Sequence, residues 1–212
     1  LRLMQDVPFY VNMNSMEVWS HKREFMVQPD GRPIQLAGCP PDHYHEHGQV
    51  WDKPMYNFDY IKEEQYVNFR NRFIWTARNF DAMRIVHFKG FDFIWKVPED
   101  RNPEHGAWSA GPGRPLLEMI KNDLPNVLFT AEDQGLMRPT LKEMEKEFSI
   151  PVMDVLQYRM ETKLLKKAAA PLSAVYTSFY DTPTIEQDYA SFTNNRKIAL
   201  RRFFKKREYE HR

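Results

Sequence analysis

Cysteine is almost absent from this sequence, because Cys39 is the only one among 212 residues. A single cysteine excludes an internal disulfide and any zinc site that needs several thiolates, and it is typical of a reducing compartment. We therefore expect a cytoplasmic protein. Excess charge is missing as well, since 30 basic and 29 acidic side chains leave a net charge of +1. Without a strong field of either sign, neither nucleic acid nor an anionic membrane is an expected partner.

Long apolar runs and nucleotide-binding loops are also missing. No stretch of 18 apolar residues is present, and residues 1–10 lack the basic start and apolar core of a secretory signal. The segment Gly111-Pro112-Gly113 lacks the Lys-Ser/Thr ending of a phosphate-binding loop, and no Gly-x-Gly-x-x-Gly or Gly-x-Ser-x-Gly motif occurs. Membrane spanning, secretion, nucleotide binding and serine-hydrolase chemistry are therefore unsupported.

Apolar residues, in contrast, form 42% of the chain, and aromatic residues form 14%, which is enough to fill a globular core. Short apolar runs, which end in a carboxylate or an aromatic, predict buried strands at 1–7, 82–88, 127–132, 152–158 and 174–179. Helical patterns between and after them predict helices at 63–80, 115–123, 139–148 and 184–206. The alternation of strands and helices predicts an α/β fold.

Parallel βα units form either an open doubly wound sheet or a closed (β/α)8 TIM barrel, and periodicity does not separate the two. The positions of acids favour the barrel, because Asp6, Glu132 and Asp181 lie at or just beyond the ends of three predicted strands. A barrel needs eight strands and we count five, so we expect residues 1–212 to form a single, partial barrel domain. Residues 26–58 are rich in Pro, Gly and His and long for a barrel loop, which indicates a substrate-binding insertion.

Two of these acids suit glycosidic bond cleavage. Glu132 follows an apolar strand, where burial would raise its pKa and favour proton donation, and Asp181 has a similar position after residues 176–180. One carboxyl group can protonate the leaving oxygen while another attacks or stabilises the positively charged sugar. The alternative is structural, since acids at strand ends also cap the helices that follow.

The long insertion offers two further groups of side chains. Its aromatic residues, next to Gln49 and other polar groups, suit stacking on sugar rings, although packing within the loop explains them equally well; they are Tyr44, Trp51, Tyr56 and Phe58. His43, His45 and His47 alternate along the chain and would share one face of a strand, as ligands of a transition metal would. Loop polarity is the simpler explanation of these histidines.

A series of segments, taken in order, resembles the 4-alpha-glucanotransferase family, which includes amylomaltase and disproportionating enzyme. The segments are Gln5-Asp6-Val7-Pro8-Phe9-Tyr10-Val11, Ala37-Gly38-Cys39-Pro40-Pro41-Asp42, Gly48-Gln49-Val50-Trp51, Arg84-Ile85-Val86-His87-Phe88-Lys89-Gly90, Thr130-Ala131-Glu132-Asp133-Gln134-Gly135, Val155-Leu156-Gln157-Tyr158 and Tyr176-Thr177-Ser178-Phe179-Tyr180-Asp181. The resemblance covers nearly the whole chain. It implies a (β/α)8 barrel of which this chain spans the middle and later part.

The resemblance also implies an activity and the residues that perform it. The family moves 1,4-linked glucan segments between maltooligosaccharides with retention, through a covalent glycosyl-enzyme intermediate, and neither a metal nor an organic cofactor is expected. Glu132 would be the general acid/base, and Asp181 would stabilise the charged sugar. The expected substrate-binding residues are Asp6, Arg84, His87, Tyr44, Gln49, Trp51 and Tyr180. Alpha-1,4-glucans are therefore the expected partners, while the oligomeric state is not indicated.

The sequence departs from the family pattern at the nucleophile. The resemblance implies an aspartate between Ile85 and His87, and this chain has Val86 there. Tyr180 also replaces a histidine, and Thr182-Pro183 replaces an Asn-Asp pair. We therefore expect impaired transfer, because losing a nucleophile costs on the order of 10⁴-fold to 10⁶-fold in turnover. The alternatives are a non-catalytic glucan-binding protein and a truncated, non-functional fragment.

Overall fold

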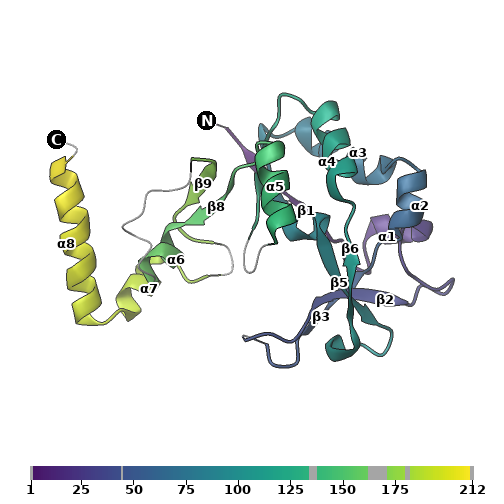
Figure 1. Ribbon diagram of the computed structural model, residues 1–212, viewed down its shortest axis with the longest axis horizontal. Coiled ribbons are helices and arrows are strands. Elements are labelled where there is room, and N and C mark those ends of the chain that lie inside the picture. Colours follow the sequence, from purple (N-terminus) through teal and green to yellow (C-terminus); the bar gives the residue numbers. More distant parts are fainter. Residues whose placement is uncertain (1, 44, 134–137, 162–170, 180–181, 211–212) are drawn as a thin grey trace. The chain divides into compact units, whose positions relative to one another are not determined.

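The computed structural model describes residues 2–43, 45–133, 138–161, 171–179 and 182–210. Contacts along the chain group it into two compact units, Leu1–Val152 and Met153–Arg212, which we describe separately. Figure 1 shows the strands and helices of both units. Among the described residues, no helix is both long enough and apolar enough to cross a membrane.

A parallel sheet forms the centre of the first unit. Its strands are β1 (Met4–Pro8), β4 (Ala82–Val86) and β7 (Leu128–Ala131), and each pairs with the next in parallel. Val152, the first residue of β8 (Val152–Val155), continues the sheet by pairing with Ala131. All three central strands lie where the sequence predicted them, so the α/β class with a parallel sheet is confirmed.

Helices follow the strands of this sheet, as βα units require. The helices of the first unit are α1 (Met16–Ser20), α2 (Phe58–Glu63), α3 (Val67–Ala77), α4 (Gly113–Asp123) and α5 (Pro139–Glu147), with short 3-10 helices at Lys22–Glu24, Phe88–Phe91 and Pro103–His105. The three longest bury one face each, for example Leu116, Leu117 and Ile120 of α4. The i, i+3 and i+4 spacing of these residues is the pattern that predicted the helices.

A second sheet, which is antiparallel, was not predicted. It has the order β3-β2-β5-β6, with β2 at Gln35–Cys39, β3 at Gln49–Pro54, β5 at Phe93–Pro98 and β6 at Ala107–Ala110. The segment 26–58, which we expected to be a long loop, therefore contains two of its strands. These strands were not predicted because they contain Gly and Pro, residues that are depleted in strands. Gly38 is required here, since a Cβ atom at this position would lie 2.1 Å from the carbonyl oxygen of Gln49.

The core of the first unit is centred on Phe9, directly after β1. Phe9 is 1% exposed, and its ring contacts those of Tyr10, Tyr56, Phe58, Phe69 and Phe91 at centroid distances of 4.9–6.4 Å. These rings come from the end of β1, the insertion, α3 and the 3-10 helix after β4. The insertion is therefore packed against the parallel sheet through a shared aromatic core.

The second unit contains the rest of β8, then α6 (Leu156–Glu161), β9 (Ser173–Tyr176), α7 (Ile185–Ser191) and α8 (Asn194–Glu210). The predicted strand 152–158 is wrong after Val155, because α6 begins at Leu156. Residues with good helix propensity form α6, and its Met160 is buried against Phe192 and Leu200. The single helix predicted at 184–206 is wrong as well. It is interrupted at Phe192, which has an extended backbone. Each of the five predicted strand segments nevertheless contains a strand.

Candidate active site

Charged and aromatic side chains gather where the parallel strands β1, β4 and β7 end. The register pairs Pro8 with Val86 and Ile85 with Ala131, so the carboxyl ends of these strands lie at one edge. This is the edge at which barrel enzymes place their functional groups. Glu132, the residue after β7, is therefore next to the end of β4.

Arg84 and Asp6 form a two-pronged ion pair across β1 and β4. Nε and Nη2 of Arg84 donate hydrogen bonds to Oδ1 and Oδ2 of Asp6 at 2.7 and 2.6 Å. The Arg84 side chain is 11% exposed, while Asp6 is 40% exposed. The two residues face each other in the strand register, which fixes the geometry of the pair. Arg84 is thereby held with its charge compensated at the floor of the site.

Glu132 is bound to the backbone that follows β4. Its Oε2 accepts a hydrogen bond from the His87 N–H at 3.0 Å, and its own N–H donates to the Ile85 carbonyl at 3.0 Å. Its carbonyl accepts from the Phe88 N–H at 3.2 Å. His87 takes a left-handed backbone with φ of 56°, which turns its N–H towards this carboxylate. The backbone from Ile85 to Phe88 therefore fixes the candidate acid next to Val86.

His87 is enclosed between two aromatic rings. Its imidazole lies 5.1 Å from the ring of Tyr10 and 5.1 Å from that of Trp51, and Trp51 Nε1–H donates to Gln49 Oε1 at 2.9 Å. Burial, together with the nearby charge of Lys89, lowers the pKa of His87 from 6.5 to about 3. The imidazole is therefore neutral at physiological pH and forms an aromatic wall with Tyr10 and Trp51.

The sequence did not single out Tyr10 as a site residue. Its hydroxyl is buried and, within the described part of the chain, has no hydrogen-bond partner. Burial raises the pKa of this hydroxyl, so Tyr10 stays protonated. Its position, four residues after Asp6 and just past the end of β1, could have indicated a site residue.

A partly buried cluster of charged residues next to Glu132 was missed too. Lys142 Nζ lies 2.7 Å from Asp133 Oδ2 and 3.0 Å from Glu145 Oε2, and the Glu145 side chain is 4% exposed. Burial raises the pKa of Glu145. Since Asp133 follows Glu132 directly, this network anchors the end of the segment that carries the candidate acid. Only the fold, which brings Lys142 of α5 to Asp133, reveals it.

The predicted site residues thus fall into two groups. Asp6, Arg84, His87, Glu132, Gln49 and Trp51 lie on the described part of the first unit, whereas Tyr44, Tyr180 and Asp181 lie outside the described residues. At the expected nucleophile position, Val86 is half-buried and ends β4. Its isopropyl group has no electron pair with which to attack a sugar.

A parallel βα sheet with functional side chains at the carboxyl ends of several strands is typical of (β/α)8-barrel enzymes. The family model described as 4-alpha-glucanotransferase, glycoside hydrolase family 77, matches residues 1–212, so the chain belongs to this family. The fold is that of part of its barrel. This confirms the family resemblance and the fold class that the sequence indicated.

Individual relatives agree with the family model. The chain is 32% identical over 210 residues to a 4-alpha-glucanotransferase of Thermus thermophilus, covering 96% of this chain and 42% of the relative. It is 30% identical over 215 residues to the chloroplastic/amyloplastic 4-alpha-glucanotransferase of Solanum tuberosum, covering 99% of this chain and 37% of the relative. Amylomaltase from Streptococcus agalactiae, solved in complex with acarbose, superposes with a TM-score of 0.86 at 26% identity, covering 97% of this chain and 43% of that one. The chain therefore spans less than half the length of these relatives.

Proposed function

We propose that this chain is part of a 4-alpha-glucanotransferase catalytic barrel whose transfer activity is impaired by Val86. The proposal treats residues 1–212 as one partial catalytic domain, with 26–58 as its substrate-binding insertion, in a cytoplasmic protein. Its substrates would be alpha-1,4-glucans and maltooligosaccharides, and no metal or organic cofactor would take part in the transfer.

The position of Glu132 carries this proposal. It lies at the end of β7 beside the end of β4, and the His87 N–H holds its carboxylate. In this role Glu132 would protonate the leaving oxygen and then activate the acceptor hydroxyl, as retaining glycosidic chemistry requires of one acid. Asp181 would stabilise the positively charged sugar.

The other residues of the site would bind sugar. Arg84, with its charge balanced by Asp6, would form part of the site floor, and the wall that contains Trp51 and His87 would pack against a sugar ring. Gln49 supports the Trp51 indole. Tyr44 and Tyr180 belong to the same proposed binding surface by resemblance alone.

Replacing Val86 by aspartate tests the proposal. Within a complete barrel, Val86→Asp should raise the release of glucose from maltotriose at least about a hundredfold, which is part of what a missing nucleophile costs. Val86→Asn is the matched control, because asparagine has nearly the shape of aspartate but no nucleophilic carboxylate. This variant should release glucose at the rate of the original protein. Adding Glu132→Gln to Val86→Asp should remove the gain. A folded Val86→Asp protein with an unchanged rate would refute Val86 as the cause of impairment.

Val86 itself favours a second candidate, a glucan-binding protein without transfer activity. Such a protein would keep the aromatic wall and the Arg84–Asp6 pair while lacking the attacking group. Calorimetric titration with maltoheptaose separates the two functions. Tight binding without redistribution of chain lengths, in both the original protein and Val86→Asp, supports the binding protein, whereas a folded protein that releases no heat excludes it.

A further inference from the structure

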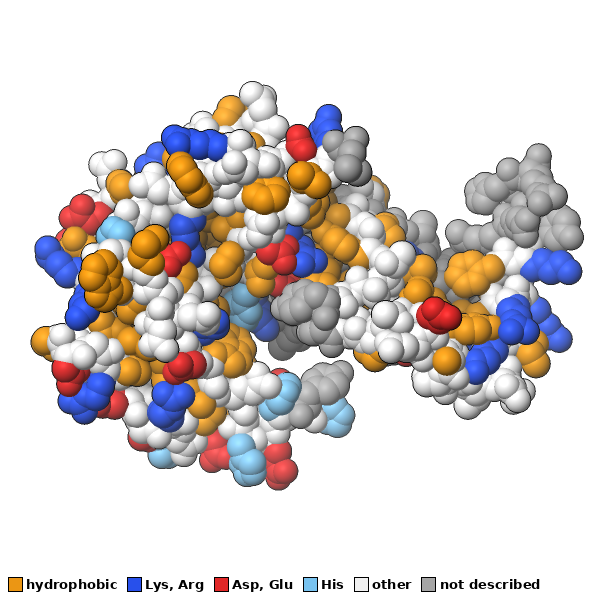
Figure 2. Space-filling view, turned by 180° about the vertical axis from the view of Figure 1, so that it is seen from behind, with side chains coloured by type: hydrophobic (Ala, Val, Ile, Leu, Met, Phe, Trp, Pro, Cys, Tyr) orange, Lys and Arg blue, Asp and Glu red, His pale blue; other side chains and the backbone are white. Residues whose placement is uncertain are grey.

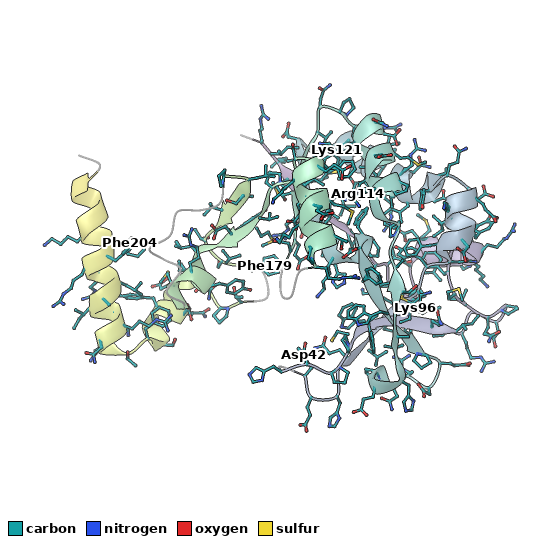
Figure 3. The ribbon with its side chains drawn as sticks, in the orientation of Figure 1. Asp42, Lys96, Arg114, Lys121, Phe179 and Phe204 are labelled. Carbon is teal, nitrogen blue, oxygen red and sulfur yellow. The ribbon has the colours of Figure 1, made fainter. Side chains whose placement is uncertain are left out.

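The turn that joins β2 to β3 brings together a thiol, a carboxylate and an imidazole. The ligand atoms of Cys39, Asp42 and His45 all lie within 4.8 Å of one another, and His45 Nδ1 is 3.3 Å from Asp42 Oδ1. In the part of the chain that the structure describes, no other three or more His, Cys, Asp or Glu side chains converge in this way. Figure 3 shows Asp42 at the far end of this hairpin, and Figure 2 shows several histidine side chains exposed along the same edge.

The backbone of the turn holds these side chains in place. The Asp42 N–H donates to the His45 carbonyl at 2.9 Å, and the His45 N–H donates back to Asp42 Oδ1 at 2.7 Å. Gly48, with φ of 70°, closes the turn onto Cys39, because a Cβ atom there would lie 2.5 Å from the Cys39 carbonyl oxygen. These contacts hold Cys39, Asp42 and His45 close together.

This set of ligand atoms matches the preferences of a borderline-soft metal ion. Thiolate, imidazole and carboxylate are the ligands that Zn²⁺ takes in tetrahedral sites, whereas Mg²⁺ and Ca²⁺ prefer oxygen atoms alone. Two negative ligands and one neutral imidazole would also balance the +2 charge. We propose that Cys39, Asp42 and His45 bind a divalent transition metal, with Zn²⁺ the best match and water completing the tetrahedron.

The proposed site revises two expectations from the sequence. The three alternating histidines do not converge, because His47 Nδ1 lies 2.8 Å from Glu104 Oε1 and only His45 joins the cluster. The expectation that the chain binds no metal applies to the transfer reaction, and the proposed ion takes no part in it. Cys39 pairs with Gln49 across the β-ladder, and Gln49 bonds Trp51. A bound ion would therefore stiffen the hairpin next to the aromatic wall.

Metal binding at this site should release the proton of the Cys39 thiol. An unbound cysteine thiol carries its proton at neutral pH, whereas a metal ion binds the thiolate. Binding the metal replaces this proton, and about one proton should be released for each ion bound.

Titration of the protein with Co²⁺, a spectroscopic substitute for Zn²⁺, tests the site. We expect one ion per chain, a thiolate-to-cobalt charge-transfer band, and displacement of cobalt by Zn²⁺. Cys39→Ser should abolish the band, and Asp42→Asn and His45→Ala should each weaken binding at least about tenfold. The matched control is His105→Ala, because His105 forms a similar exposed pair with Asp100 at 2.7 Å. No thiol lies beside that pair, since Cys39 is the only cysteine in the chain. This control should bind as the original protein does.

Two results would overturn the proposal. The first is that the original protein shows no charge-transfer band at saturating cobalt. The second is that Cys39→Ser binds cobalt as tightly as the original protein, which would mean that exposed imidazoles bind the metal nonspecifically. If Cys39→Ser does not fold, alkylation of Cys39 in the original protein replaces it. Zn²⁺ should slow that alkylation at least about tenfold, and an unchanged rate would refute the site.

Discussion

Two strands of the first unit, one from each sheet, differ in how far they are buried. In the parallel sheet, β4 is buried along most of its length, and its charged residue Arg84 is paired with Asp6 by two hydrogen bonds. In the antiparallel sheet, β6 is mostly exposed, and Trp108 on it is 58% exposed. The proposed metal ligands lie in a turn of this second sheet.

The difference follows from what covers each sheet. Helices pack against a parallel sheet, so a charge within it must be compensated by a partner. An antiparallel sheet can leave one face to solvent, and its side chains are then free to serve binding. We therefore expect substitutions in and next to the buried strand β4 to change stability much more than substitutions in the exposed strand β6.

The largest effect is expected at Phe9, beside the parallel sheet. Phe9→Ala should lower the free energy of unfolding by about 3–5 kcal/mol, because it removes a ring that is 1% exposed and contacts five others. Denaturant unfolding followed by tryptophan fluorescence measures it. A loss below about 1 kcal/mol would contradict the central place of Phe9 in the core.

The second largest effect is the pH dependence of stability that His87 causes. Its folded pKa of about 3 lies below the unfolded value near 6.5, so the unfolded chain binds the additional proton between these values. This contribution to stability is complete above about pH 7 and is lost as the pH falls, by about 2 kcal/mol from pH 7 to pH 5. Unfolding curves of the original protein and His87→Gln over this range should differ in slope, and identical slopes would exclude an enclosed neutral imidazole.

A smaller effect is expected at the ion pair. Asp6→Asn removes the charge that compensates Arg84, whose side chain is 11% exposed, and should cost about 1–2 kcal/mol because Asp6 itself is partly solvated. The midpoint of urea unfolding reports this loss. Asp30→Asn is the matched control, since Asp30 pairs with Arg32 at the surface, and it should leave the unfolding midpoint almost unchanged. Equal losses at the two positions would remove the distinction between buried and surface pairs.

The smallest effect belongs to the antiparallel sheet. Trp108→Ala should cost about 0.5–1 kcal/mol, because the exposed indole loses mainly its edge contact with Trp95 at 5.1 Å. Thermal unfolding is the measurement. A loss as large as that of Phe9→Ala would show that Trp108 stabilises the fold as much as a core ring does, and the comparison between buried and exposed strands would fail.

Much of the first unit could be predicted from local patterns. Apolar runs that end near Asp6, Val86 and Glu132 located β1, β4 and β7, because a buried parallel strand is a short, nearly continuous apolar segment. The position of Glu132 at a strand end was readable for the same reason. The antiparallel sheet was missed because β2 and β3 contain Gly38 and Pro54, and because β2 also pairs with β5, which lies far along the chain.

The sequence by itself determined the α/β class, the acid after β7 and the valine at the end of β4, since these depend on residue type and on spacing within one element. Only the tertiary structure decided that Arg84 binds Asp6, that Lys142 holds Asp133, and that Cys39 meets Asp42 and His45. These contacts depend on chain segments that approach one another through strand register and turn closure. Spacing along the chain does not encode such distances, because burial and backbone pairing set them after folding.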